Sequence, residues 1–294
     1  MATEKVMISE QILQDTADSI RTKLNTEDKI KPVEFAEKID GMNIAAPVEK
    51  GLVINAYDSN GYVTDASIIG MTIIPDNYCN GLMTSTNIYK NISDNLQLPS
   101  GLTKVGMNVF KNCDALTGIY LSETVVEVAW AAFDGSSIKN IQIPNSVTTM
   151  SYYVFQNCKK LENVIYSSGC STLYTSMFYG CSALTSITNL DGVKSLDQQC
   201  FWACSSLESI ELPIVEKIGK SAFINCSKLK KIILSRVTSV PTLDIYQTFD
   251  STPIKSGTGY IYVPDTLVED FKVATNWSTI ATQIKGLSEL EVSE

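Results

Sequence analysis

Phenylalanine recurs at a nearly fixed interval through the middle of the chain. Successive members of this series are separated by 22 or 23 residues: Phe110, Phe133, Phe155, Phe178, Phe201 and Phe223. A period of this length is typical of repeat proteins whose units stack along one axis. It is the strongest constraint on what this chain can fold into.

Other positions repeat in step with phenylalanine. Three residues after each phenylalanine, five of the six units carry cysteine: Cys113, Ser136, Cys158, Cys181, Cys204 and Cys226. Apolar residues recur eight and five residues before each phenylalanine, and leucine or isoleucine opens the following unit. The unit therefore reads LxxIxLP, then VxxI, a small residue, Phe, two residues and Cys.

No single unit of this kind can bury its own apolar side, so each must pack against the equivalent residues of its neighbours. The Ile-x-Leu fragments predict short parallel strands about 4.8 Å apart, and roughly seven rungs would give a body of about 35 Å. We expect an α+β repeat solenoid with leucine-rich repeats and parallel strands, a short N-terminal helical module and a C-terminal strand-helix cap.

The cysteine column invites a functional interpretation. A metal ladder or disulfides are conceivable, but the side chains would come from stacked rungs, which gives a line rather than a tetrahedron and poor disulfide geometry. Ser136 shows that a non-thiol is accepted in the column. We interpret the column as packing and expect no metal, disulfide or other cofactor, with Cys170 and Cys200 in two other apolar columns and Cys79 outside the repeat.

Composition excludes several classes of function. The formal charge of −9 and pI near 4.7 disfavour nucleic acid and anionic membrane surfaces as partners. The chain contains no histidine, which removes the commonest general base and zinc ligand. No nucleotide-binding, triad or calcium-loop motif occurs, so we expect a protein that is not an enzyme.

The residues of the repeat resemble a known family. The string LESIELPIVEKIGKSAFINCSKLKKIIL is similar to BspA-like bacterial leucine-rich repeats. This similarity extends over about residues 92–240. The class is similar to cell-surface adhesins and to phage and prophage structural proteins, and it implies a recognition scaffold without defining its ligand. The partners that we expect are a protein or a glycan of a host surface. Tyr166 and residues 187–193 depart from the pattern, which predicts a local bulge.

The two ends differ from the repeats. Residues 1–46 predict two short amphipathic helices, which resemble an N-terminal module of phage tail and virion-associated proteins. The helices either dock to a partner or cap the first rung. The apolar side chains that are candidates for this contact are Ile12, Leu13, Ile20, Phe35 and Ile39. Residues 47–91 predict a β-rich segment with strands near 52–56 and 71–75. Residues 241–294 predict a cap with a last strand at 259–263, a helix after Pro264 and a second short helix.

Two sets of side chains are candidates for ligand contact. Positions of the strands that should face away from the core are Tyr120, Gln142, Ile165, Thr188, Glu211 and Ile233. Aromatic residues at equivalent positions of neighbouring units are Trp130 and Tyr152, three residues before phenylalanine, and Tyr179 and Trp202, one residue after it. Such aromatic ladders either bind sugars or protein partners or stack on each other between rungs.

Residues 1–20 lack the continuous apolar stretch of a signal peptide, so we expect synthesis in a bacterial cytoplasm. This expectation and the resemblance of residues 1–46 favour a phage or prophage virion-associated recognition or structural protein, which could form a homo-oligomer. The alternative is a bacterial cell-surface or secreted adhesin.

Overall fold

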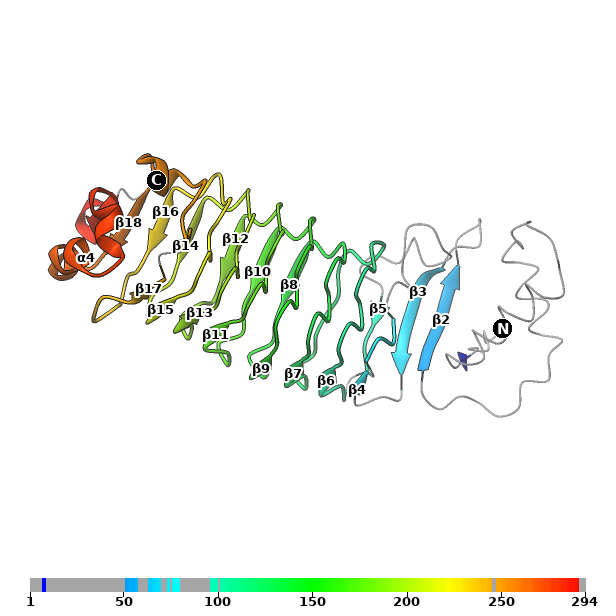
Figure 1. Ribbon diagram of the computed structural model, residues 1–294. Helices are drawn as coiled ribbons and strands as arrows, with labels where there is room; N and C mark the ends of the chain where they lie inside the picture. Colours follow the sequence, from blue (N-terminus) through cyan, green and yellow to red (C-terminus); the bar gives the residue numbers. More distant parts are fainter. Residues whose placement is uncertain are drawn as a thin grey trace, which may run out of the picture.

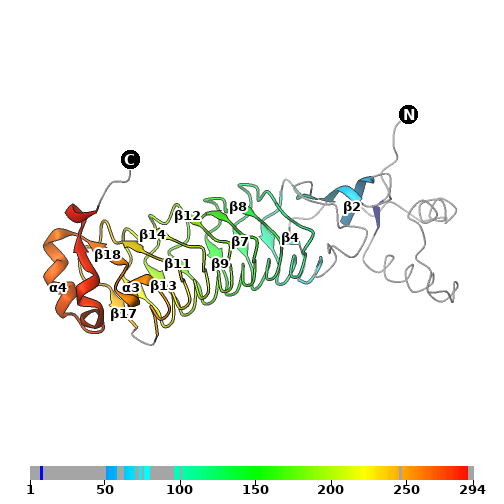
Figure 2. The same cartoon turned by 90° about the horizontal axis from the view of Figure 1, so that it is seen from above.

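The computed structural model describes residues 7–8, 51–57, 63–69, 73–74, 76–79, 96–99, 101–244 and 247–290. Its main body is an elongated stack of similar rungs that runs along one axis, with short helices at the C-terminal end (Figure 1). Figure 2, from above, shows the rungs edge-on. Each rung contributes to two strand faces and one turn face, and the predicted parallel-strand solenoid is confirmed.

Strand face A consists of short parallel strands, one per rung. The first sheet holds β8 (Asn140–Gln142), β10 (Asn163–Ile165) and β12 (Ser186–Thr188), and the second holds β14 (Ser209–Glu211), β16 (Lys231–Ile233), β18 (Tyr260–Val263) and β19 (Ile284–Gly286). In β8, β10 and β14 the central residue is buried and both neighbours are exposed. The period-2 alternation of a strand therefore places one aliphatic residue per rung in the core.

Strand face B is built from two-residue strands, and in the six rungs from Phe110 to Phe223 the second residue belongs to the apolar column five residues before phenylalanine. One sheet holds β4 (Ile73–Ile74), β6 (Lys104–Val105), β7 (Glu127–Val128) and β9 (Thr149–Met150); the other holds β11 (Thr172–Leu173), β13 (Ser195–Leu196), β15 (Lys217–Ile218) and β17 (Thr242–Leu243). The second residue of each pair is buried.

The turn face carries the Phe-x-x-Cys segments and has no regular strands. Its backbone nevertheless bonds from rung to rung, as when the amide of Phe110 donates to Ala132 O at 2.7 Å and that of Phe133 donates to Val154 O at 2.9 Å. Positive φ recurs two residues before and two residues after each phenylalanine, for example at Asn108 (53°) and Asn112 (56°). Asparagine and glycine suit these left-handed positions, and they occupy five of the six positions that follow the predicted phenylalanines: Asn112, Gly135, Asn157, Gly180, Ala203 and Asn225.

Stacked phenylalanine rings run through the core. Neighbouring rings from Phe110 to Phe223 have centroids 5.3–5.6 Å apart and lie within 14° of parallel. A seventh ring, Phe249, continues the stack 6.0 Å from Phe223. All six predicted members are fully buried, as is every cysteine of the cysteine column. The predicted continuous core is confirmed.

Cys79 also belongs to this stack, which corrects the prediction that it lies outside the repeat. Its amide donates to Val109 O at 3.0 Å, as the amide of each phenylalanine donates to the next rung, and β4 pairs with β6 before it. Cys79 therefore occupies the phenylalanine position of an earlier rung. This rung could not be recognised from the sequence period, because Cys79 and Phe110 are 31 residues apart rather than 22 or 23.

Both strand faces are interrupted near the middle of the body, face B between β9 and β11 and face A between β12 and β14. At the second break Asn189 adds one residue between Thr188 and the buried Leu190, and it adopts a φ of 63°. One rung earlier, Tyr166 replaces the usual leucine; it is fully buried and its hydroxyl donates to Thr172 O at 2.8 Å. The predicted bulge is confirmed at residues 187–193, whereas β10, which ends just before Tyr166, pairs in regular register with β8 and β12.

A small sheet lies before the body, with strand order β1 (Met7–Ile8), β2 (Gly51–Tyr57), β3 (Val63–Ile69) and β5 (Leu96–Gln97). β2 and β3 are antiparallel, whereas β5 joins β3 in parallel. β2 and β4 coincide with the predicted strands near 52–56 and 71–75. The predicted helices of residues 1–46 lie outside the described residues.

The C-terminal end closes the stack with short helices and one more strand. α3 (Pro253–Ser256) precedes β18, and η1 (Asp265–Leu267), α4 (Val268–Val273) and η2 (Trp277–Gln283) lead to β19 and η3 (Leu287–Glu289). Phe271 and Trp277 meet edge to face at 4.8 Å, and Trp277 Nε1 donates to Pro241 O at 2.7 Å. The predicted helices are confirmed, but residues 259–263 are not the last strand, because β19 pairs in parallel beyond β18.

Candidate functional site

The strand-face candidates point outward, as the alternation predicts. Tyr120 and Ile165 are 70% and 46% exposed, and Gln142, Thr188 and Glu211 are exposed as well, whereas Ile233 is half-buried. The break between β12 and β14 divides this set, so Glu211 and Ile233 belong to another sheet. The set mixes a phenol, an amide, aliphatic side chains and a carboxylate, and it forms no uniform surface.

Tyr179 and Trp202 lie on the turn face, in neighbouring rungs. Their rings stack with centroids 5.6 Å apart and an interplanar angle of 28°, and both side chains are half-buried. Ile224 follows in the same column and is buried. Each ring therefore directs one face at the other, which favours the intramolecular stack over a platform for a ligand.

Trp130 and Tyr152 lie at a different place, the corner where strand face B meets the turn face. They belong to what we call the corner row, the residues three positions before each phenylalanine in five consecutive rungs: Met107, Trp130, Tyr152, Thr175 and Gln198. The first three are 43%, 37% and 47% exposed. Strands β6, β7 and β9, whose labels follow the lower edge of the body in Figure 1, end just before them.

The backbone of the corner row is fixed by a ladder of hydrogen bonds. Each carbonyl accepts an amide from the preceding rung: Asn108 N donates to Trp130 O at 3.0 Å and Ala131 N donates to Tyr152 O at 3.1 Å. The same bond joins Ser176 N to Gln198 O at 3.0 Å. The row is thus held on a rigid frame, which lowers the entropy cost of binding.

Two further tyrosines support the exposed rings. Tyr153 meets the Trp130 ring edge to face at 5.8 Å, and Tyr174 meets Tyr152 in the same way at 5.8 Å. The Lys111 ammonium lies 5.6 Å from the centroid of the Trp130 ring and also pairs with Asp134 at 3.0 Å. Sequence columns did not single out Tyr153 and Tyr174, because neither falls in an aromatic column.

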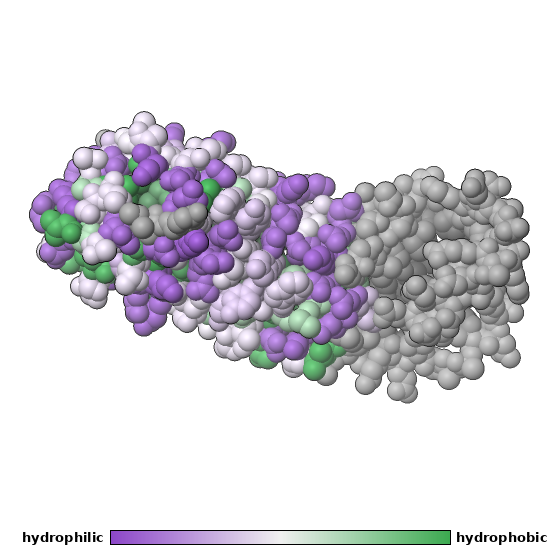
Figure 3. All heavy atoms as spheres, viewed as in Figure 1, coloured by the Kyte–Doolittle hydropathy of each residue, from purple (hydrophilic) through white to green (hydrophobic). Residues whose placement is uncertain are grey.

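Hydrophobic side chains reach the surface in few places in the view of Figure 3, among them the lower edge beside β6 and β7. Ile73, in β4, is 50% exposed, and Val126, just before β7, is 46% exposed; both lie near the start of the body. The corner row lies next to this apolar surface.

The thiols of the cysteine column are structural donors. Each donates to the carbonyl of the phenylalanine-column residue one rung earlier, at distances of 3.0–3.2 Å, in these pairs: Cys113 to Cys79, Cys158 to Phe133, Cys181 to Phe155, Cys204 to Phe178 and Cys226 to Phe201. Burial raises the pKa of Cys158 and Cys226 to about 12. A thiol with so high a pKa is a poor nucleophile and a poor metal ligand at neutral pH.

A family model described as the BspA type leucine-rich repeat region matches the chain in six copies, over residues 84–208 and 173–258. These ranges cover more than half of the sequence and coincide with the stacked rungs. The protein belongs to the BspA-type leucine-rich repeat family. The predicted resemblance of residues 1–46 to phage tail proteins lies outside this match, and the structure describes only residues 7–8 of that segment.

Several solved structures are similar to this BspA-type protein. A leucine-rich repeat protein from Bacteroides ovatus is 26% identical, with a TM-score of 0.47, over 71% of this chain and 56% of that one. A leucine rich cell surface protein from Faecalibacterium prausnitzii is 14% identical (TM-score 0.26; 72% and 93% covered), and the pneumococcal vaccine antigen PcpA is 13% identical (TM-score 0.33; 79% and 80% covered). This chain therefore spans little more than half of the B. ovatus protein. No curated protein matches it.

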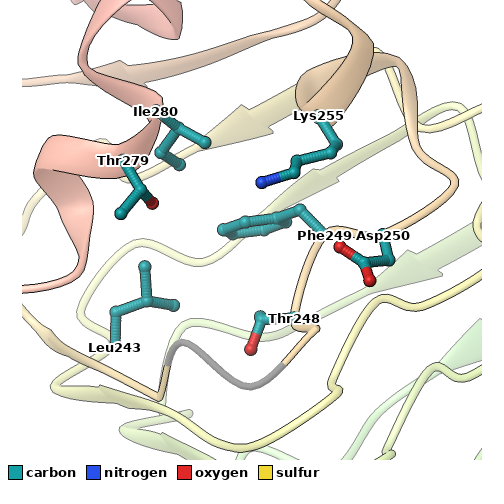
Figure 4. A pocket seen from close by; sticks show the side chains of 7 residues that line it. All are labelled: Leu243, Thr248, Phe249, Asp250, Lys255, Thr279 and Ile280. Atoms are coloured by element: carbon teal, nitrogen blue, oxygen red, sulfur yellow. The ribbon is translucent and has the colours of Figure 1, made fainter.

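The BspA-type protein also has a pocket of about 100 Å³ between the last phenylalanine rung and the cap (Figure 4). Leu243, Phe249 and Ile280 give it apolar walls, and Thr248, Asp250, Lys255 and Thr279 complete the lining. Lys255 points toward the Phe249 ring. Sequence reasoning missed this pocket because Phe249 falls 26 residues after Phe223 and so outside the expected period.

Within the residues that the structure describes, no helix is both long and apolar enough to cross a membrane. Nor do three or more cysteine, aspartate or glutamate side chains gather there as a metal site would require.

Proposed function

We propose that this protein is a non-enzymatic adhesin of a bacterial surface, and that it binds its ligand through the corner row. The observation that carries the proposal is the row itself. Met107, Trp130 and Tyr152 expose large side chains in consecutive rungs although the core has places for apolar residues in every rung. Exposed tryptophan, tyrosine and methionine on a rigid frame are typical of recognition surfaces.

The chemistry of the chain supports binding rather than catalysis. It contains no histidine. Burial raises the pKa of four column thiols, Cys158, Cys181, Cys204 and Cys226. Family membership supports the same conclusion, because stacked repeats supply a long surface and no preformed reaction centre. In this proposal the stacked Tyr179 and Trp202 rings stabilise the turn face and do not contact the ligand.

The bacterial surface is the location that we propose, because the repeat class resembles that of surface adhesins. One similar structure is described as a cell surface protein, and that description applies to the Faecalibacterium protein. The virion-associated alternative depends on residues 1–46 and stays a prediction. Fractionation of the producing cells distinguishes the two: the proposal requires the protein in the surface or secreted fraction, and recovery in purified phage particles would contradict it.

Attachment of the labelled full-length chain to intact cells tests the binding surface. Replacing Trp130 and Tyr152 together by serine removes about 2 kcal/mol or more if they are hot spots, which is at least about a thirtyfold loss of affinity. The melting temperature should fall less than in a core variant, because both side chains are partly exposed and lose only their edge-to-face contacts with Tyr153 and Tyr174. Replacing Tyr120 and Ile165 by serine, on strand face A, is the matched control and should leave attachment unchanged.

The Tyr179→Ser and Trp202→Ser double variant completes this experiment. We expect a lower melting temperature, because the stacked pair is lost, and unchanged attachment. Loss of attachment in this variant with full attachment in the corner-row variant would move the binding surface to the turn face and overturn the proposal.

A further inference from the structure

We infer that the corner row binds an uncharged, linear glycan that lies along the axis of the solenoid. This inference rests on the proposed function and names the ligand class of the same surface. In five consecutive rungs the row contains no aspartate, glutamate, lysine, arginine or histidine: Met107, Trp130, Tyr152, Thr175 and Gln198. Charged residues occur only at its two ends, Asp76 in the rung before and Lys220 in the rung after.

The charges beside the aromatic part of the row are already paired. Lys111 pairs with Asp134 at 3.0 Å and Lys104 pairs with Glu127 at 2.8 Å. The Asp76 carboxylate accepts the amide of Met107 at 2.7 Å. In a chain with a net charge of −9, an anionic ligand would meet repulsion from the whole molecule. The two lysines that the structure describes beside these rings, Lys104 and Lys111, are already paired. The surroundings therefore favour a neutral ligand.

The row combines what a sugar requires. The indole and phenol rings of Trp130 and Tyr152 offer apolar surface to the C–H groups of a pyranose. Thr175 and Gln198 add a hydroxyl and an amide farther along, and Asp197, next to Gln198, adds a carboxylate that can accept from hydroxyl groups. A ligand with alternating apolar and hydrogen-bonding edges, such as a sugar chain, matches this sequence of groups.

The shape of the row separates a glycan from a protein partner. Five rungs at about 4.8 Å span about 19 Å between the first and last members, along the axis of the solenoid. A standard protein interface covers about 800 Å² on each side, so it would extend well beyond this single row onto the paired charges of Lys104 and Glu127. An extended sugar chain, by contrast, is narrow, and its rings follow one another at a spacing close to that of the rungs.

Calorimetric titration of the full chain with neutral oligosaccharides of increasing length tests the inference. The probes are β-glucan, α-glucan, xylan, mannan and N-acetylglucosamine oligomers, with polygalacturonate and hyaluronan as acidic counterparts. We expect one neutral series to bind with an affinity that rises with length until the glycan spans the five rungs. Trp130→Ala and Tyr152→Ala should each lower that affinity at least about tenfold, and Gln198→Ala should lower it only for the longer oligomers.

Tyr120→Ala, on strand face A, is the control and should bind like the parent. The inference fails if no neutral series binds, if an acidic polymer binds better, or if the corner-row variants bind as the parent does. Treating the cells with periodate or with protease then separates this failure from that of the proposed function. Attachment that depends on Trp130, survives periodate and is lost on proteolysis would retain the adhesin and replace the glycan by a protein.

Discussion

At the scale of single residues, the phenylalanine rings and the thiols hold the rungs together. Phe178 lies between Phe155 at 5.6 Å and Phe201 at 5.5 Å, and its side chain is fully buried. Each thiol bonds to the carbonyl of the rung before it. Dispersion between the rings and these weak hydrogen bonds act between the same neighbours, so each rung depends on the next.

Phe178→Ala should lower the free energy of unfolding by about 3–5 kcal/mol, because it leaves a cavity between two rings. Phe110→Ala should cost less, since Phe110 has a ring, Phe133, on one side and the smaller Cys79 on the other. Denaturant unfolding of both variants measures the difference. Equally small losses at the two positions would argue against a continuous core.

The buried thiols predict a loss of stability at alkaline pH. Burial raises the pKa of Cys158 and Cys226 to about 12, whereas the thiols of the unfolded chain titrate near about 8.5. The stabilising contribution is therefore complete below about pH 8.5 and declines as pH rises toward the folded-state pKa, by about 1.4 kcal/mol per pH unit for each thiol.

Unfolding free energies measured across this pH range check the prediction, and Cys158→Ser provides the control. Ser136 shows that serine fits the column, and a hydroxyl can replace the thiol as donor to Phe133 O. In this variant the decrease in unfolding free energy per pH unit should be smaller by the contribution of one thiol. A stability that does not change between about pH 8.5 and 11 would contradict the assignment of buried, neutral thiols.

At the scale of strands and rungs, periodicity made most of the fold predictable. The columns gave the core, the parallel strands and the outward positions of Tyr120 and Ile165, because each column has one environment in every rung. Periodicity could not reveal the rungs of Cys79 and Phe249, because Cys79 lies 31 residues before Phe110 and Phe249 lies 26 residues after Phe223. It also could not distinguish Trp130 from Trp202, because exposure depends on which neighbours cover each ring.

The break in strand face A has a testable cause in one residue. Deleting Asn189 turns Ile187-Thr-Asn-Leu190 into Ile-Thr-Leu, the spacing found in Ile210-Glu-Leu212. We expect β12 to pair with β14 and the amides of residues 209–211 to exchange at least about tenfold more slowly with solvent deuterium. Unchanged exchange would show that the extra residue does not cause the break.

Asn189→Ala is the matched variant for this deletion. It removes the side-chain hydrogen bonds to Tyr166 O at 2.6 Å and to Asn145 Oδ1 at 3.2 Å but keeps the extra residue. Stability should fall by about 1 kcal/mol, and the exchange of residues 209–211 should stay fast. The pair of variants therefore separates the effect of the bulge from that of its hydrogen bonds.

At the scale of the whole molecule, the turn face is the element that crosses both breaks. Ser176 N donates to Gln198 O at 3.0 Å and Phe178 N donates to Cys200 O at 2.8 Å. These bonds join the rungs of Phe178 and Phe201, whose strands β12 and β14 belong to different sheets. The phenylalanine stack crosses the same region without a gap. The corner row borders this continuous face, so its five members keep a common frame although the sheets do not.

Hydrogen exchange of the phenylalanine-column amides tests the central claim, that one uninterrupted stack forms the body. Six of these amides donate to the next rung at 2.7–3.1 Å: Phe110, Phe133, Phe155, Phe178, Phe201 and Phe223. All six should exchange slowly in the full chain, with Phe155 and Phe178 slowest and protection decreasing smoothly toward both ends. Fast exchange at Phe155 or Phe178 while the outer amides stay protected would contradict the claim, because it would mean two separate stacks.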